Sequence, residues 1–415
     1  MIELSLITII LGAVALTFAL IAPWFNIMVR RPSCDVNIYP DEPEENQDDD
    51  PIEETISTID TISTIDTIDT ISPHHPISGP PLSIIITTHD NARELRANLP
   101  LFLSQDYPPG FQVIIVQEKS DSETDDIIKL HSSDERLYST FVPDSSRYMS
   151  RPKLAVTLGV KAAKYDWVVI ADVRCAPAST HLFEHIGNRC KDGTDMISVY
   201  TNYDQATPPY WRFERFLTNL YLMREYANST AYRCEDSCLV MRKQMFIDGD
   251  AYRGNLKYLR GELDFIVNKY AKDGNTTSVN APEARLIEEV PTHKTLRNKH
   301  VYYLETRKHL MRSKAHRIPF NIDMTMCHLA WLVILGVITT AAILQDWIAL
   351  GAGVLSIVIY YLLRMSICRK AFRSFSEKLS VWKAPFFELS LFWHDINYRV
   401  HYGKADKYDF ITHKL

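Results

Sequence analysis

The 415-residue chain has no surplus of basic side chains. It contains 45 Lys and Arg against 51 Asp and Glu, which gives a formal net charge of −6 and a pI near 6.2. No basic motif stands out. Because nucleic-acid-binding domains concentrate Lys and Arg on one face, we expect no nucleic-acid partner.

The chain also lacks a paired cysteine framework. Its seven cysteines are odd in number and irregular in spacing, which favours a reducing compartment for the soluble part. Cys234 and Cys238 have a spacing that could supply half of a metal site, but no matching Cys or His pair accompanies them. We therefore predict no zinc site there.

The first long apolar run has no basic residues before it. It extends over Ile2–Met28, longer than the roughly 20 residues that cross a bilayer, and Arg30 and Arg31 follow it. This order of charges differs from that of a cleaved signal peptide. We predict a retained transmembrane helix over residues 1–29, with its C-terminal end in the cytoplasm.

Two further apolar runs lie near the C-terminus. Thr325–Leu344 and Trp347–Leu363 are separated only by Gln345 and Asp346, which predicts a transmembrane hairpin over 325–363. Lys and Arg precede the first run and follow the second, so both flanks are expected in the cytoplasm. The tail at 364–415 mixes aromatic and basic residues, which is typical of interfacial helices.

Residues 30–80 form a biased segment between the first span and the rest of the chain. Acidic residues cluster in Asp41–Glu54, and a Thr-Ile-Ser/Asp repeat runs from Thr55 to Ser72. This composition cannot build a core, so we predict a disordered linker.

Strands and helices alternate in the segment 81–310. Leu82–Thr88 and Phe111–Val116 are predicted strands, and Asn91–Ser104 is a predicted helix between them. A third buried strand begins at Trp167 and ends at Asp172. The pattern predicts an α/β domain with a mainly parallel sheet, and a carboxylate at a strand's C-terminal end lies where such sheets bind ligands.

Three sequence motifs follow one another in the first part of this segment. They are Thr87-Thr88-His89-Asp90, Gln105-Asp106-Tyr107-Pro108 and Val116-Gln117-Glu118-Lys119-Ser120-Asp121. Together they make the segment 81–310 resemble a bacterial, membrane-anchored family 2 glycosyltransferase, which is inverting and has the GT-A nucleotide-diphospho-sugar transferase fold. The resemblance implies a Rossmann-like sheet that binds a nucleotide sugar.

The resemblance assigns roles at the nucleotide end of the site. Thr87 and His89 would line the base pocket, Glu118 would accept a hydrogen bond from the uracil edge, and Lys153 would contact the diphosphate. Each has a structural alternative: a turn residue for His89, a helix N-terminal acid for Glu118 and a solvated basic loop for Lys153.

The central motif departs from the family. After the third strand the family has Asp-x-Asp, whose last acid holds Mn²⁺ or Mg²⁺, whereas this chain has Asp172-Val173-Arg174. Arginine has donors only and cannot ligate a cation. Either Arg174 replaces the metal by neutralising the diphosphate, or the domain binds without catalysis; Asp172 and His293 remain the candidate metal ligands.

The resemblance places the general base in a Gly-Glu-Asp-type motif, which stands here as Gly261-Glu262-Leu263-Asp264. Inverting transfer needs one carboxylate to take the acceptor hydroxyl's proton, and we favour Asp264, with Glu262 as the alternative. Both could also be ordinary first-turn helix acids. Lys294 and Arg297 are further candidates for phosphate or acceptor contacts.

The implied function is transfer of a sugar from a UDP-sugar to a lipid-linked or cell-surface glycan, with inversion, as in hexosyltransferases of cell-envelope glycan synthesis. The enzyme would be a multi-pass protein of the inner membrane with a cytoplasmic catalytic domain. One alternative is a catalytically silent, nucleotide-sugar-binding subunit of a glycan-assembly complex. A synthase that exports its polysaccharide ranks last, because three spans leave little room for a channel in a monomer.

Overall fold

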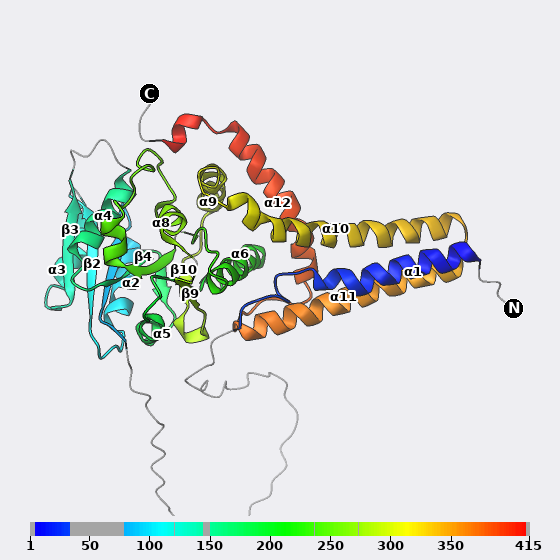
Figure 1. The fold of residues 1–415 in the computed structure, drawn as a ribbon, viewed down its shortest axis with the longest axis horizontal. Helices are drawn as coiled ribbons and strands as arrows, with labels where there is room; N and C mark the ends of the chain where they lie inside the picture. The colour runs from blue at the N-terminus through cyan, green and yellow to red at the C-terminus, as the bar shows by residue number, and fades with distance from the viewer. Residues whose placement is uncertain are drawn as a thin grey trace, which may run out of the picture.

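The structure is a computed structural model that describes residues 5–33, 79–119, 121–143, 150–235, 237–272 and 274–411 (Figure 1). Most of the linker predicted over 30–80 lies outside these residues. The described chain has an α/β part and a group of long helices that extends from one side of it.

The α/β part is built on a seven-stranded sheet. Its strands, in spatial order, are β3 (Leu137–Val142), β2 (Phe111–Glu118), β1 (Leu82–Thr87), β4 (Trp167–Asp172), β8 (Cys238–Arg242), β6 (Met196–Val199) and β9 (Thr276–Val279). The strands from β3 to β4 are parallel, β8 runs antiparallel to β4 and β6, and β9 is parallel to β6. The mainly parallel α/β prediction is confirmed.

Helices cover both faces of this sheet because its strands are apolar on both sides. Ile84 and Ile86 of β1 pack into one core, and Ile85 packs into the other. The first core is covered by α2 (Ala92–Leu103), α3 (Ser122–Leu130) and α5 (Leu182–Arg189). The second is covered by α4 (Arg151–Ala162), α6 (Pro209–Ala227), α7 (Lys243–Asp248) and α8 (Glu262–Tyr270).

A second sheet has three short strands in the order β5-β10-β7. They are β5 (Cys175–Pro177), β10 (Leu286–Glu288) and β7 (Thr201–Tyr203). Their register sets Glu288 opposite Cys175 and beside Tyr203. The last residue of β10 therefore lies next to the segment that follows β4.

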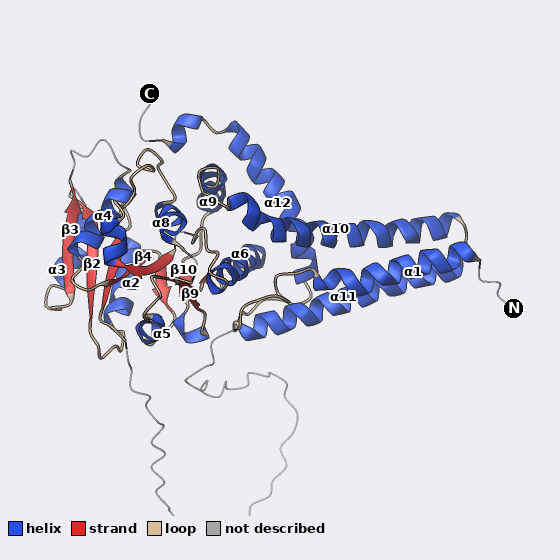
Figure 2. Cartoon of the chain, in the orientation of Figure 1, coloured by secondary structure: helices blue, strands red, loops and turns tan. Residues whose placement is uncertain are grey.

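Three helices are long and apolar enough to cross a membrane: Leu6–Trp24, α10 (Ser313–Ile343) and α11 (Trp347–Ser374). The first comprises α1 (Leu6–Ile21) and a short 3₁₀ turn (Ala22–Trp24), and α1 packs against both α10 and α11. Figure 2 shows that this part of the molecule is helical and that the strands gather elsewhere. The expectation of one N-terminal and two C-terminal apolar helices is confirmed.

Two more helices join the apolar bundle to the α/β part. They are α9 (His293–Thr306) and α12 (Ala384–Lys404), which pack against each other. Helix α12 also contacts α6, α10 and α11. It is therefore the C-terminal element that touches both parts of the molecule.

Candidate active site

The sheet register brings the C-terminal ends of β2, β1 and β4 into one row. Thr87 pairs with Val116 on one side and with Asp172 on the other. The backbone N–H of Thr88 donates to the Val116 carbonyl at 2.9 Å, so this row continues past the strand ends. This edge is where open α/β sheets bind ligands.

At the β2 end, the Glu118 carboxylate lies between the side chains of His89 and Arg151. His89 Nδ1 is 2.9 Å from Glu118 Oε1, and Arg151 Nε donates to the same oxygen at 2.7 Å. The predicted base-pocket residues Thr87, His89 and Glu118 are therefore neighbours. Arg151, at the start of α4, is a fourth member that the sequence did not indicate.

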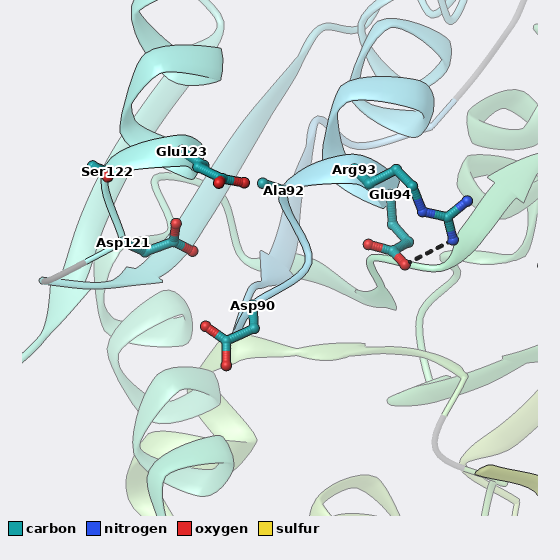
Figure 3. Close-up of a pocket in the computed structure, with 7 residues that line it drawn as sticks. All are labelled: Asp90, Ala92, Arg93, Glu94, Asp121, Ser122 and Glu123. Carbon is teal, nitrogen blue, oxygen red and sulfur yellow. Dashed lines mark hydrogen bonds and ion pairs between the residues drawn. The ribbon is translucent and has the colours of Figure 1, made fainter. Parts of the chain in front are cut away.

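A pocket of about 500 Å³ opens beside this group, at the N-termini of α2 and α3 (Figure 3). Four carboxylates and one guanidinium are the charged groups that line it: Asp90, Glu94, Asp121, Glu123 and Arg93. Arg93 pairs with Glu94 at 3.0 Å and also with Glu289. A surface so rich in acceptors suits N–H and O–H donors and disfavours phosphate.

Lys153 does not face this edge. Helix α4 starts at Arg151 because the Ser150 hydroxyl caps it by accepting from Lys153 N at 3.3 Å. The fully buried Lys153 ammonium donates to the Asn255 and Tyr258 carbonyls at 2.8 and 2.5 Å. This ammonium fastens α4 to the 252–258 loop, and the diphosphate contact of Lys153 stays a prediction.

At the β4 end, Arg174 folds back onto Asp172. Its Nε and Nη2 donate to the two carboxylate oxygens at 3.0 and 2.6 Å, and its backbone N–H donates to Oδ1 at 2.9 Å. Such a two-point contact fixes the guanidinium plane as well as its position. Both side chains remain partly exposed at this edge.

Glu288 connects Arg174 to two further cations. Arg215 Nη2 lies 3.1 Å, Lys299 Nζ 3.3 Å and Arg174 Nη2 3.8 Å from its carboxylate. Arg215 also pairs with Glu235 at 2.8 Å. Together with Asp172, these five groups form a network of three cations (Arg174, Arg215 and Lys299) and three anions (Asp172, Glu235 and Glu288), which we call the Glu288 network.

The network keeps Glu288 ionised despite its burial. Desolvation alone would raise the pKa of this carboxyl group, but the charges of Lys299, Arg215 and Arg174 more than offset it and lower the pKa to about 2. The charge of Asp172 and its hydrogen bonds raise the pKa of Arg174 above its already high ordinary value. All three cations therefore keep their charge at neutral pH.

The residues of this edge do not fit a divalent metal. The third position of the Asp-x-Asp pattern is a donor, and it occupies both oxygens of the one remaining acid. Among the described residues, no three His, Cys, Asp or Glu side chains are grouped to hold an ion. His293 packs edge-on against Trp211 at 4.6 Å instead of joining Asp172.

Glu262 and Asp264 lie together on the first turn of α8, and both are buried. Asp264 Oδ1 accepts a hydrogen bond from the Cys234 backbone N–H at 2.9 Å. Glu235, one residue further, pairs with Arg215. The segment 234–235 thus joins Asp264 to the Glu288 network.

Lys294 and Arg297 are exposed on the first turns of α9. Lys299, later on the same helix, is the α9 cation that reaches Glu288. The sequence analysis did not single out Lys299, and the contacts predicted for Lys294 and Arg297 stay predictions.

Arg215 and Glu288 were also missed. Arg215 stands among large aromatic and aliphatic residues in helix α6, and Glu288 ends a strand of three residues. The position of Arg215 among apolar residues of a helix could have indicated a buried ion pair, because a charged side chain is rarely buried unless it is paired.

Part of the chain matches a known family model, and the chain is similar to a solved structure. Residues 83–249 match the family model described as "Glycosyl transferase family 2". A solved structure, the mannosyltransferase PcManGT from Pyrobaculum calidifontis in complex with GDP-Man and Mn²⁺, is similar with 15% identity and a TM-score of 0.45, over 94% of this chain and 98% of that one. No curated protein matches. The matched residues include the ends of β1, β2 and β4, and the mainly parallel α/β sheet is consistent with the GT-A fold.

Proposed function

We propose that this protein is a membrane-bound glycosyltransferase that moves a sugar from a UDP-sugar to a lipid-linked or cell-surface glycan, with inversion. The observation that carries the proposal is the Glu288 network at the C-terminal edge of a family 2 domain. It gathers Arg174, Arg215 and Lys299 around Glu288, and Arg174 also pairs with Asp172, at the edge where the leaving diphosphate of a nucleotide sugar would bind.

The nucleoside is assigned to the β1 and β2 ends. Glu118, held by His89 and Arg151, offers a carboxylate to the uracil N–H, and Thr87 borders the same position. The acceptor-rich pocket at Asp90 and Asp121 suits base and ribose donors. Asp172 would lie near the ribose, as the first acid of its motif.

The diphosphate is assigned to the cations. Arg174 and Lys299 are partly exposed, whereas Arg215 is buried behind them and supports Glu288. As the bond between the anomeric carbon and the diphosphate breaks, negative charge grows on the leaving oxygen. Fixed guanidinium and ammonium groups stabilise that charge. No step of this scheme uses a metal, because the residues present do not fit one.

The acceptor is activated by a carboxylate on α8. Asp264, or Glu262 beside it, takes the proton of the acceptor hydroxyl while that oxygen attacks the anomeric carbon from the face opposite the diphosphate. A single displacement of this kind inverts the anomeric centre. The buried position of both acids on one helical turn supports the assignment.

One observation favours a second candidate function. Asp172 and Arg174 satisfy each other in a closed ion pair. A diphosphate must compete with that carboxylate for the guanidinium. If it cannot, the protein is a nucleotide-sugar-binding subunit of a glycan-assembly complex without turnover of its own.

Substitution of the candidate bases separates the two. We expect the full-length protein in membranes to release UDP from a UDP-sugar when acceptor is present. Asp264→Ala, or Glu262→Ala, should abolish turnover while UDP binding, measured by calorimetry, is retained. A wild-type protein that binds UDP but turns over none of several UDP-sugars would establish the silent subunit instead.

A further inference from the structure

Helix α12 has two apolar faces, and only one of them is covered. Ala384, Glu388, Leu391 and Tyr398 recur every three to seven positions and are buried against neighbouring helices. The opposite side carries the exposed apolar residues Phe386, Trp393, Ile396 and Val400. Together with the exposed Trp382, which lies two residues before the helix, we call them the outer stripe.

The outer stripe follows a helical repeat. From Phe386 its members come at steps of seven, three and four residues, which places them on one side of the helix. Trp393 keeps 66% of its surface exposed and Phe386 56%. A continuous aromatic and aliphatic stripe of this kind marks a contact surface rather than scattered exposure.

The stripe is continuous with the apolar surface of the candidate spans. The Tyr361 hydroxyl of α11 donates to the Trp382 carbonyl at 2.6 Å, and its ring lies 5.9 Å from that of Phe386. On α10, the His328 ring lies 5.2 Å from Phe392. The helices α10, α11 and α12 therefore meet at one level (Figure 1).

That level is the end of both apolar segments nearest the α/β part. The apolar segment of α10 begins after Asp323, five residues before His328, and that of α11 ends at Arg364, three residues after Tyr361. The other ends of both segments meet at the turn 344–346. In a bilayer this level is the head-group region, where Tyr and Trp concentrate.

Buried polar contacts fix α12 at this level. Glu388 accepts from Arg364 Nε of α11 at 2.9 Å and from Asn26 Nδ2, just after the first span, at 2.6 Å. Exposed Lys378, Lys383 and Lys404 lie before and at the end of the helix, where they suit anionic head groups.

We propose that α12 lies on the membrane surface, with its outer stripe in the acyl and head-group boundary of the cytoplasmic leaflet. The occupant of the exposed face is lipid. Its inner face holds α6 and α9: Glu214 of α6 lies 3.6 Å from His300 of α9, and Tyr398 of α12 donates to Glu214 at 3.4 Å. The surface helix thereby sets the distance of the catalytic domain from the bilayer.

Spin labels at single cysteines test the contact in the full-length protein. The background carries Cys34→Ser and Cys190→Ser, because the other five cysteines are buried. Trp393→Cys and Val400→Cys report on the outer stripe, in nanodiscs of phosphatidylcholine and phosphatidylglycerol. Leu355→Cys, exposed in the middle of α11, is the lipid reference, and Asp192→Cys, fully exposed on the α/β part, is the water reference.

We expect oxygen to relax the labels at 393 and 400 nearly as strongly as the label at 355. A water-soluble nickel complex should relax the labels at 393 and 400 much less than it relaxes the label at 192. Equal nickel access at 192, 393 and 400 would place the stripe in water and overturn the proposal. Labels shielded from both agents would show that protein covers the stripe, and would overturn it equally.

Discussion

In the mechanism that we propose, the transfer step depends on Arg174. Its guanidinium stands where a metal-binding acid is expected and is oriented by both oxygens of Asp172. Arginine matches phosphate oxygens in the same two-point geometry. A diphosphate can therefore take over a contact for which the side chain is already aligned.

Replacing Arg174 by aspartate restores the Asp-x-Asp pattern and removes this cation. Charged hydrogen bonds contribute about 1.5–3 kcal/mol, so turnover in the presence of EDTA should fall roughly ten- to hundred-fold. UDP release measured with EDTA, and again with Mn²⁺, checks this. Arg174→Lys is the matched control: it keeps the charge but loses the two-point contact, and its loss should be smaller.

Glu288 supplies a counter-charge to the three cations Arg174, Arg215 and Lys299. Glu288→Gln leaves Arg215 and Lys299 near one another without their shared counter-charge. Breaking a buried pair in this way costs about 3–5 kcal/mol of folding free energy. Denaturant unfolding in detergent should show this loss, whereas Asp126→Asn, on an exposed pair with Lys129, should change stability by less than about 1 kcal/mol.

The ionisation of Glu288 also makes the stability of the folded protein depend on pH in the acid range. Its pKa is about 2 in the folded protein against an ordinary value of 4.5. A lowered folded-state pKa means that its stabilisation is complete above pH 4.5 and is lost as the pH falls toward 2. Unfolding midpoints recorded between pH 6 and pH 3 should fall more steeply for the wild type than for Glu288→Gln; parallel curves would contradict this role.

At the scale of elements, the backbone conformation of the residue before helix α8 is one that favours glycine. Gly261 precedes it with φ +83°, and a Cβ there would lie 2.5 Å from the Thr306 side chain. The start of the helix that carries Glu262 and Asp264 is thus packed directly against α9. Only glycine combines this backbone conformation with this close approach.

Gly261→Ala should therefore lower both stability and turnover. The backbone conformation alone costs about 1–2 kcal/mol, and the clash with Thr306 adds to it. Gly254→Ala is the control, because Gly254 has φ +95° and nothing within 4 Å of an added Cβ. Thermal unfolding should separate the two variants; equal losses would mean that the contact with Thr306 is unimportant.

The elements that the sequence predicted are those with a strong periodic signal. The strands at Leu82, Phe111 and Trp167 and the apolar helices were found because long apolar runs identify them. The strands β5, β7 and β10 have three residues each, too few for a period to appear. The Glu288 network depends on those strands, so most of it could not be predicted.

The local sequence around a residue did not predict the position of its side chain where tertiary packing determines that position. Lys153 followed a basic loop and was assigned to a phosphate, but Ser150 caps the helix early and carries the lysine into the core. Thr87, His89 and Glu118 were grouped correctly because the ends of adjacent parallel strands meet at one edge. Their roles in binding remain predictions.

At the scale of the molecule, the charges beside the spans predict the topology. Lys and Arg flank the domain-side ends of all three spans, so the α/β part should lie in the cytoplasm and the turn 344–346 on the other side. A Leu344→Cys variant in intact cells should react with a thiol reagent that cannot cross membranes. Asp192→Cys should be protected until the cells are lysed; the reverse pattern would invert the topology.

The central claim is that fixed cations, rather than a metal ion, receive the leaving diphosphate. The most direct measurement is UDP-sugar turnover by the full-length protein in membranes, with and without EDTA. We predict that activity survives chelation and is lost on substitution of Arg174. Activity that EDTA abolishes and Mn²⁺ or Mg²⁺ restores would contradict the account, because a metal would then be held by ligands outside the Glu288 network.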